Sequence, residues 1–492
     1  MPYPARGDFQ IKGLQPDFWP DKNQLVNAGM ADVSMNLIWA SWEATPKSPP
    51  CNPSSEQEYE GHCFKIDKAV DEAIKDWTDK GVIVAAIIYG VPAWARKGNT
   101  GCSPVTDGFD IFCTPDDPDD YARFAGMLAE RYNGRNGHGR IADFVIHNEV
   151  NSNTWFDIGC GQGVPCAKDK WIKTYADNYA AAYDQIKKHQ SAAKVLFSFE
   201  HHFDTVFDKP NDKDATLSVK TFVRGLAKLL GDRQWMLAYH PYAPDLLSPD
   251  FSVNDLPKVT YGNIGVLLGW LRQEFPDKPH AWEVELTESG VNSAPPKSDE
   301  TRQAKAICDG FRNILGTPGI INYIYHRLRD NPAEGGLQLG LIRSDDSFKP
   351  SWDVWSKCSQ QGSLDCGFEN LPYTKLTRYH KTFAGHWTST RLPPDGFDAE
   401  QSWFLFRHEQ PGTKLLFECK VYTNNLLTDD PNCEGQQNMG PVGYIWTKEH
   451  DNTVPLYRCK VGQSGLDHFV STDPNCEGQI QESLLGYAIP TN

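Results

Sequence analysis

Two glutamates stand at places in the sequence where a carboxyl group can take part in a reaction. Glu149 follows the apolar run Phe144–Ile146, and Glu288 closes the run that begins at Ala281. A pair of carboxyl groups can divide the work of breaking a bond, because one donates a proton while the other attacks as a nucleophile. The two glutamates are about 140 residues apart in the chain, so the fold has to bring them together.

The elements around these glutamates follow a strand and helix alternation. Between residues 9 and 355, short apolar runs alternate with amphipathic stretches such as 66–77, 124–132 and 171–186, the pattern of a parallel sheet with crossover helices. The strand candidates are Phe9–Leu14, Val33–Trp39, Val82–Tyr89, Phe144–His147, Val195–Phe199, Trp235–Tyr239, Ala281–Thr287 and Ile320–Tyr325. Eight such units predict an α/β fold, a closed (β/α)8 TIM barrel. The alternative, an open doubly wound sheet, usually has a Gly-rich phosphate turn after its first strand, and this chain has none there.

A closed barrel explains how the two glutamates can meet. TIM barrels place their reacting groups at the C-terminal ends of the strands, and Glu149 and Glu288 end the fourth and seventh candidate strands. Two other acids, Glu283 and Glu285, lie in the same run as Glu288. Alternation along a strand turns them to the other side, so we expect structural ion pairs from them.

The motifs around the glutamates resemble those of a known enzyme clan. Asn148-Glu149 and Thr287-Glu288-Ser289-Gly290 look like the motifs of retaining glycoside hydrolases of the (β/α)8 clan with paired glutamates, which includes β-xylosidase-like, xylanase-like and cellulase-like families. The resemblance covers residues 8–356. It implies cleavage of β-glycosidic bonds, with Glu149 as acid/base and Glu288 as nucleophile, held about 5 to 5.5 Å apart.

The same resemblance implies a set of sugar contacts at other strand ends. Asn148 is expected to bond the sugar 2-hydroxyl, and either His240 or Tyr242 is expected to bond the nucleophile. The turn from Pro92 to Trp94 resembles one in the β-xylosidase-like family that lies near the catalytic subsite. The expected substrate-binding residues are Asn148, His240, Tyr242, Trp94, Trp42, Trp155, Glu200 and His326.

Some of these expectations have alternatives. The aromatic residues Trp42 and Trp155 are expected as stacking platforms or as core residues, and Glu200 as a sugar ligand or a salt-bridge partner. Strand 8 departs from the clan, which often has a Trp there, because this chain has Tyr325-His326-Arg327. Arg327 and Arg329 are expected to recognise a uronic acid or sulfate, or else to pair with Asp330 and Asp345.

The amino-acid composition argues against some classes of binding partner. The chain has 48 Lys+Arg and 64 Asp+Glu, a net charge of −16, and no cluster of four basic residues, which argues against nucleic acid and anionic membranes. Its apolar runs are too short to span a bilayer, so we expect a soluble protein, and a monomer. The pair His201-His202 has no zinc-type spacing around it. No metal or other cofactor is expected.

Thirteen cysteines point to the compartment. We predict six short-range disulfides, with Cys308 as a buried free thiol on a helix over 301–315, and disulfides imply an oxidising compartment. The start, Met1–Arg6, lacks the apolar core of a signal peptide, so a secreted chain whose signal has been removed is expected. The predicted pairs are Cys51/Cys63, Cys102/Cys113, Cys160/Cys166, Cys358/Cys366, Cys419/Cys433 and Cys459/Cys476.

The last 120 residues differ in kind from the rest. The segments 415–444 and 455–487 share a Cys, Asp-Pro-Asn-Cys-Glu-Gly and Gly-Tyr pattern, and 376–400 is a fainter copy without cysteines. Three copies of about 40 residues predict a β-trefoil-like domain, with domains at 1–362 and 363–492. The repeats resemble a module appended to secreted hydrolases but lack the Gln-x-Trp pattern of ricin-type lectins. Sugar binding and a stabilising or spacer role both remain open.

Taken together, these patterns predict a secreted retaining glycoside hydrolase that acts on a polysaccharide or its oligosaccharides. Long loops held by Cys51/Cys63, Cys102/Cys113 and Cys160/Cys166 favour a closed pocket and so a slight preference for exo action. The alternatives are a catalytically inactive carbohydrate-binding protein and a transglycosylase.

Overall fold

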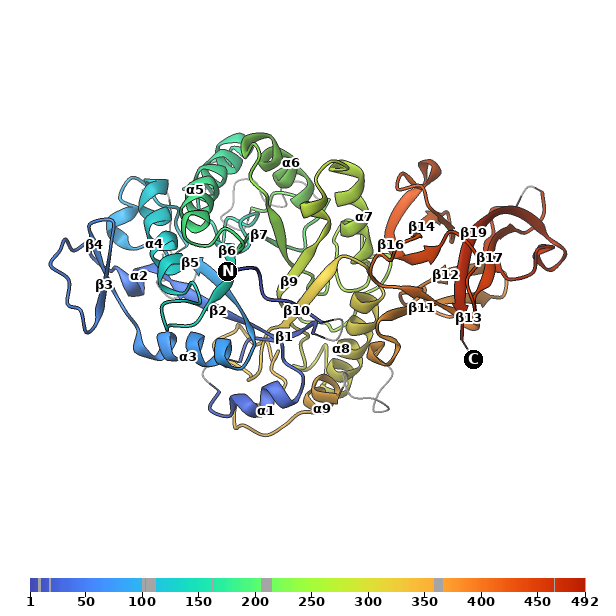
Figure 1. The fold of residues 1–492 in the computed structure, drawn as a ribbon, viewed down its shortest axis with the longest axis horizontal. Helices are drawn as coiled ribbons and strands as arrows, with labels where there is room; N and C mark the ends of the chain where they lie inside the picture. Colours follow the sequence, from blue (N-terminus) through green and yellow to red (C-terminus); the bar gives the residue numbers. More distant parts are fainter. Residues whose placement is uncertain are drawn as a thin grey trace. The chain divides into compact units, whose positions relative to one another are not determined.

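The structure, a computed structural model, describes residues 1–7, 10–16, 19–99, 102, 112–161, 163–204, 215–357, 366–463 and 465–491. Within them, eight parallel strands close into a barrel in the order β1-β10-β9-β8-β7-β6-β5-β2 (Figure 1). The predicted TIM barrel is therefore confirmed. Its strands are β1 (Lys12–Leu14), β2 (Asp32–Ile38), β5 (Ile83–Tyr89), β6 (Ile141–Ile146), β7 (Lys194–Glu200), β8 (Met236–His240), β9 (Val284–Ser289) and β10 (Ile320–Tyr325).

Helices follow the barrel strands, and several begin at an aspartate. The side chains of Asp67, Asp117 and Asp299 accept hydrogen bonds from first-turn backbone N–H groups of α3, α4 and α8, donors that a helix leaves unpaired. In the described chain, no helix is both long and apolar enough to cross a membrane. The helices are α1 (Lys22–Asn27), α2 (Trp39–Trp42), α3 (Lys68–Asp79), α4 (Pro118–Arg131), α5 (Lys168–His189), α6 (Val219–Leu229), α7 (Gly265–Glu274), α8 (Glu300–Leu315) and α9 (Pro350–Lys357).

A cluster of buried charges lies at the starts of the barrel strands. Arg6, from the segment before β1, pairs with Asp32 at 2.5 Å and with Asp143 at 3.5 Å. Lys194 pairs with Glu285 at 3.1 Å, as expected for Glu285, whereas Glu283 is exposed. Three acids that are fully buried in this way require the nearby cations, because an unpaired buried charge is costly.

An all-β domain follows the barrel. It has nine antiparallel strands in the described chain, arranged as three successive groups of three (Figure 1), and the third strands of the groups pair with one another. The predicted all-β domain and its three repeats are present, and the β-trefoil assignment stays a prediction. The strands are β11 (Tyr373–Lys381), β12 (Gly385–Ser389), β13 (Asp398–Phe406), β14 (Thr413–Val421), β15 (Asn424–Thr428), β16 (Gln437–Trp446), β17 (Val454–Lys460), β18 (His468–Ser471) and β19 (Ile480–Pro490).

The chain separates into two compact units, and the predicted domains 1–362 and 363–492 stay a prediction. The first comprises Met1–His240, Glu285–Gly290 and Asn322–Leu328, and the second Pro241–Val284, Val291–Ile321 and Arg329–Asn492. Helices α7 and α8 thus belong with the all-β domain, because side chains of that domain bond to the end of α8. Thr390 donates to the carbonyl of Gly316, and Arg407 to that of Leu315. The predicted boundary at residue 362 lies outside the described residues.

Six disulfides are present in the described chain. Five were predicted: Cys51–Cys63, Cys102–Cys113, Cys160–Cys166, Cys419–Cys433 and Cys459–Cys476. The first of these closes the loop that carries a two-stranded sheet, β3 (Glu56–Tyr59) and β4 (His62–Lys65).

The prediction for the sixth disulfide was wrong. Cys366 pairs with Cys308, 58 residues away, so Cys308 is not a free thiol, and Cys358 lies outside the described residues. Short spacing favoured Cys358 as the partner, but the fold brings the segment at Cys366 against α8. Spacing alone does not determine connectivity.

Candidate functional site

Glu149, His240 and Glu288 come together from three strand ends of the first unit. One side-chain oxygen of each glutamate and one ring nitrogen of the histidine all lie within 4.8 Å of one another. His240 is the last residue of β8; its Nδ1 hydrogen-bonds Oε1 of Glu149 at 2.8 Å, and its Nε2 lies 3.1 Å from the hydroxyl of Thr287. Either His240 or Tyr242 was expected to bond Glu288. His240 hydrogen-bonds Glu149, and a ring nitrogen of it also lies within 4.8 Å of Glu288, so this expectation stays a prediction.

The turn that carries Glu149 is held by the next strand. His147 and Glu149 have φ values of +56° and +40°, the left-handed region that non-glycine residues adopt only when the surroundings impose it. The backbone N–H of Glu149 donates to the hydroxyl of Ser198 at 2.9 Å, and that of Val150 to the Ser198 carbonyl at 2.9 Å. These bonds to β7 aim the Glu149 side chain at His240.

Burial sets the protonation of this pair. Glu149 is 7% exposed, and burial raises its pKa above the ordinary value; the bond to His240 opposes the rise, and the charges of Glu288 and Glu200 add to it. Burial lowers the pKa of His240, but its bond to Glu149 and the nearby carboxylates outweigh burial and raise it. Glu149 is therefore suited to hold a proton, and Glu288 is partly exposed.

Asn148 presents a polar atom without a protein partner. The residue is 6% exposed, and its Oδ1 has no hydrogen-bond partner in the described structure. A buried carbonyl oxygen left unsatisfied is costly, so a donor on a bound molecule would relieve it. This observation is compatible with the expected sugar hydroxyl.

Glu200, by contrast, has its bonding capacity filled by protein groups. It accepts hydrogen bonds from Asn151 and from the backbone and ring of His202. Burial opposes its ionisation, but the bonds from His202 and the charges of His201 and His202 lower its pKa. Of the two alternatives for Glu200, a sugar ligand or a salt-bridge partner, its contacts are those of a salt-bridge partner.

The expected aromatic contacts divide into core and partly exposed residues. Trp42 is 4% exposed and packs on Phe124, so it offers no open face. Trp94 is partly exposed, donates to the Glu43 carbonyl at 2.9 Å, and meets Trp39 edge to face.

Sequence reasoning missed two partly exposed rings near the carboxylates. Tyr89 ends β5, and burial followed by the charge of Glu288 raises its pKa to about 12. Phe112 stacks on Tyr89 with 5.7 Å between ring centroids, and Trp155 meets Phe112 at 4.7 Å. Tyr89 ends an apolar run as Glu149 and Glu288 do, and that position could have identified it. Phe112 offered no such signal.

The structure also describes three further residues that the sequence singled out. His326 follows β10 and hydrogen-bonds Gln15 through Nδ1. Tyr242 is buried in the second unit. Arg329 is paired with Asp346 at 2.5 Å.

Two of these clusters also have the composition of a metal site. Glu149, His240 and Glu288 form one, and Glu200, His201 and His202 form another. Carboxylate oxygens and imidazole nitrogens are ligands for several divalent metals, so this alternative needs an experiment.

Comparison with protein families gives one match. Residues 4–372 match the family described as "Family of unknown function (DUF5722)". A search of curated proteins finds no match.

Comparison with solved structures returns glycoside hydrolases at low identity. A family 39 glycoside hydrolase from Bacteroides cellulosilyticus WH2 is 12% identical, with a TM-score of 0.47, covering 99% of this chain and 83% of that one. A monomeric beta-xylosidase from Caulobacter crescentus CB15 is 13% identical, with a TM-score of 0.49 and coverages of 85% and 83%. A family 1 β-glucosidase from Thermotoga maritima is 14% identical, with a TM-score of 0.44 and coverages of 70% and 86%.

Proposed function

The chain belongs to the DUF5722 family, whose function is unknown, and we propose from its own site that it is a retaining β-glycoside hydrolase. The observation that carries the proposal is the approach of Glu149 and Glu288 to within 4.8 Å at strand ends of a closed barrel. Retaining glycosidases hold their carboxyl groups about 5 to 5.5 Å apart, whereas inverting ones leave roughly 6.5 to 9.5 Å for a water molecule.

The proposed reaction has two steps. In the first, Glu149 donates its proton to the glycosidic oxygen as the C–O bond breaks, and a carboxylate oxygen of Glu288 bonds to the anomeric carbon. In the second, the Glu149 carboxylate takes a proton from water, whose oxygen displaces Glu288. One water is consumed, and both glutamates return to their starting states.

The surrounding residues support this division of roles. Glu149 is the more buried carboxyl, with a raised pKa, as an acid must be. Asn148 has an unsatisfied carbonyl oxygen for a sugar hydroxyl, and the rings of Tyr89, Phe112 and Trp155 offer partly exposed apolar faces. The proposed substrate is a polysaccharide or its oligosaccharides, with a slight preference for exo action.

We also propose a division of the chain into domains and a cellular location. We assign residues 1–362 to a catalytic barrel and 363–492 to a β-trefoil-like accessory domain. The six disulfides favour an oxidising, extracellular location.

Product analysis on a panel of polysaccharides and aryl β-glycosides tests the function. We expect release of sugars with the anomeric configuration retained, and replacement of Glu288 or Glu149 by Gln to lower kcat/KM by about 10³-fold. Glu283→Gln, at an exposed acid just before β9, is the matched control and should keep full activity. Thermal melting of each variant confirms that it folds.

The outcomes separate the alternatives. Inverted products, or a Glu288→Gln variant within tenfold of the parent, would remove the proposed mechanism. Activity lost on chelation and restored by a divalent metal would point instead to the metal alternative for the Glu149, His240 and Glu288 cluster. Sugar transfer in place of hydrolysis at high acceptor concentration would identify a transglycosylase.

A further inference from the structure

The three repeats of the all-β domain can be superposed residue by residue through their strand register. The central residue of each first strand is Thr377, Phe417 or Tyr457. Each pairs with one residue on the second strand and one on the third. The equivalent sets are Thr377, Ser389 and Ser402; Phe417, Thr428 and Pro441; and Tyr457, Ser471 and Leu484.

In the second and third repeats, the face that carries these central residues is apolar. Phe417 packs in a cluster with the Cys419–Cys433 disulfide. Tyr457 packs against a cluster that contains the Cys459–Cys476 disulfide. A small sealed core therefore occupies this position in both repeats.

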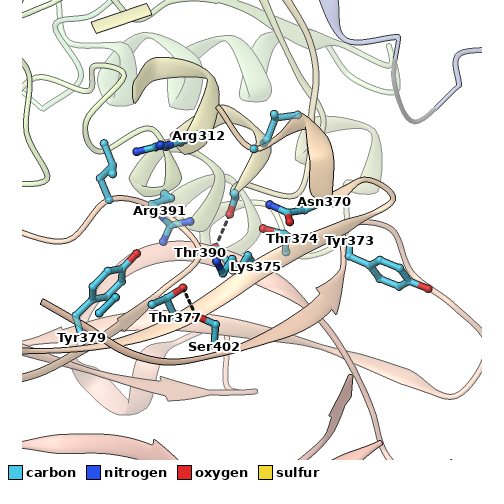
Figure 2. Close-up of a pocket in the computed structure, with 15 residues that line it drawn as sticks. Arg312, Asn370, Tyr373, Thr374, Lys375, Thr377, Tyr379, Thr390, Arg391 and Ser402 are labelled. Carbon is cyan, nitrogen blue, oxygen red and sulfur yellow. Dashed lines mark hydrogen bonds between the residues drawn. The ribbon is translucent and has the colours of Figure 1, made fainter. Parts of the chain in front are cut away.

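The first repeat carries polar residues on the equivalent face. Lys375 stands where the second repeat has Leu415, and Tyr379 stands where it has Cys419. Thr377 and Ser402, on neighbouring strands β11 and β13, are joined by a hydrogen bond of 3.0 Å between their hydroxyls (Figure 2). No disulfide can form here, because this copy of the repeat has no cysteines.

In the first repeat, where polar residues take the place of the apolar core, there is a pocket of about 180 Å³ between β11 and the end of α8. Arg312 contributes from α8, and Lys375, Thr377 and Tyr379 from β11 (Figure 2). The volume is below the roughly 300 to 1,000 Å³ of pockets for drug-sized ligands. It therefore suits a single small group.

The charge in the pocket has one sign. Among the residues that the structure describes, its lining includes Arg312, Lys375 and Arg391 and no Asp or Glu, in a chain of net charge −16. Arg391 is neutralised by Glu418 at 2.6 Å, and Arg312 lies 3.8 Å from Asp309. Lys375 is exposed and has no ion pair in the described part of the chain.

Two arginines of this domain, one in the first repeat and one in the third, show what a neutralised arginine looks like. Arg378 contacts Glu400 at 2.8 Å and Glu477 at 2.7 Å. Arg458 contacts Glu434 at 2.6 Å and Glu482 at 2.9 Å. Two carboxylates per arginine leave little attraction for an external anion, whereas Lys375 has no ion pair among the residues that the structure describes.

We propose that this pocket binds the anionic group of an acidic saccharide, either a carboxylate or a sulfate ester on a sugar. Lys375 faces the anion, and the hydroxyls of Thr377 and Ser402 bond the neighbouring sugar oxygens. The choice of a saccharide rests on the proposed hydrolase function, whereas the choice of an anion rests on the lining itself. The all-β domain would then hold an acidic glycan at a site separate from Glu149 and Glu288.

Ligand-observed NMR on the full chain tests the proposal with D-glucuronic acid, glucose 6-sulfate, glucose and inorganic sulfate. We expect one or both acidic sugars to bind and glucose not to bind. Lys375→Met should weaken their binding by about tenfold or more, since a charge-assisted hydrogen bond is lost. Thr377→Phe, which installs the residue of the second repeat, should abolish it by filling the pocket.

Lys448→Met is the matched control, because Lys448 is an exposed lysine between β16 and β17, and it should leave binding unchanged. Equal binding of glucose, or no effect of Lys375→Met, would overturn the proposal. Inorganic sulfate bound as tightly as glucose 6-sulfate would overturn its saccharide part.

Turnover of a small aryl glycoside, measured on the same variants, keeps the two proposals distinguishable. Lys375→Met should leave this turnover unchanged, because the lysine lies outside the proposed catalytic machinery. A chain that binds acidic sugars without any turnover would refute the hydrolase but not the pocket. Turnover without binding would refute the pocket alone.

Discussion

At the residue scale, the contact between Glu149 and His240 controls where the proposed acid loses its proton. The hydrogen bond from His240 stabilises the ionised carboxylate, and burial opposes it. His240→Gln should therefore raise the pKa of Glu149. Because kcat/KM falls at high pH when the acid is deprotonated, the alkaline limb of its pH profile should move to higher pH. An unmoved limb would mean that another group governs it.

Glu200 acts on the same carboxyl in the opposite direction. Its negative charge raises the pKa of Glu149, so Glu200→Gln should lower that pKa and move the alkaline limb to lower pH. Profiles of the two variants, recorded beside Glu283→Gln as a control, should lie on either side of the parent. Shifts of both variants in one direction would exclude this electrostatic account.

Residue types and positions were enough to find the two glutamates but not their partners. Glu149 and Glu288 end apolar runs, and a barrel brings strand ends to one rim. His240 was predicted as a partner of Glu288, and it lies within 4.8 Å of both glutamates. Its hydrogen bond to Glu149 depends on side-chain directions inside the barrel, which the sequence does not show. Trp42 was proposed as a platform on its residue type, and its burial against Phe124 was not visible in local sequence.

At the element scale, the Cys308–Cys366 disulfide links α8 to the segment before β11. Loop-closure entropy grows with loop length, so removing a disulfide that closes 58 residues should cost about 4 kcal/mol, against about 2 kcal/mol for six residues. Urea denaturation of Cys308→Ala/Cys366→Ala and Cys160→Ala/Cys166→Ala double variants measures this difference. Equal losses would show that local packing, and not chain entropy, dominates.

The first repeat illustrates how an element is adapted to its neighbour. Its third strand, β13, leads to Arg407, which donates to the Leu315 carbonyl, and Leu392 donates to the side chain of Asn313. The end of α8 thus finds donors for groups that a helix terminus leaves open. In this repeat, contacts with α8 take the place of the disulfide-containing core that the other two repeats have.

At the scale of the whole molecule, the barrel was predictable and the division into units was not. Strands such as β10, Ile320–Tyr325, are apolar runs of the expected length, and their number determined the architecture. Which helices pack with the all-β domain depends on contacts such as Thr390 with Gly316, between residues 74 positions apart. Such contacts leave no periodic signal in the sequence.

The segment before β1 also stabilises the whole barrel, because Arg6 bridges Asp32 and Asp143. Burial raises the pKa of Asp32 to about 6 and that of Asp143 to about 7 even with Arg6 present. Carboxyls with raised pKa values favour the folded state fully below their unfolded value, 3.8, and this contribution is lost as pH rises through 6 and 7. Without Arg6 both pKa values should rise further.

Arg6→Met should therefore destabilise the barrel much more at pH 8 than at pH 5. At pH 8 the variant has to keep the two carboxylates charged without their main cation or take up protons against the solution pH, and breaking such a buried pair costs about 3 to 5 kcal/mol. At pH 5 both are largely protonated in the folded state, so the loss should be at most about 1 kcal/mol. Urea denaturation at the two pH values measures the difference, with Arg135→Met, at an exposed arginine, as the control. A loss that is independent of pH would show that Arg6 acts through packing and not through its charge.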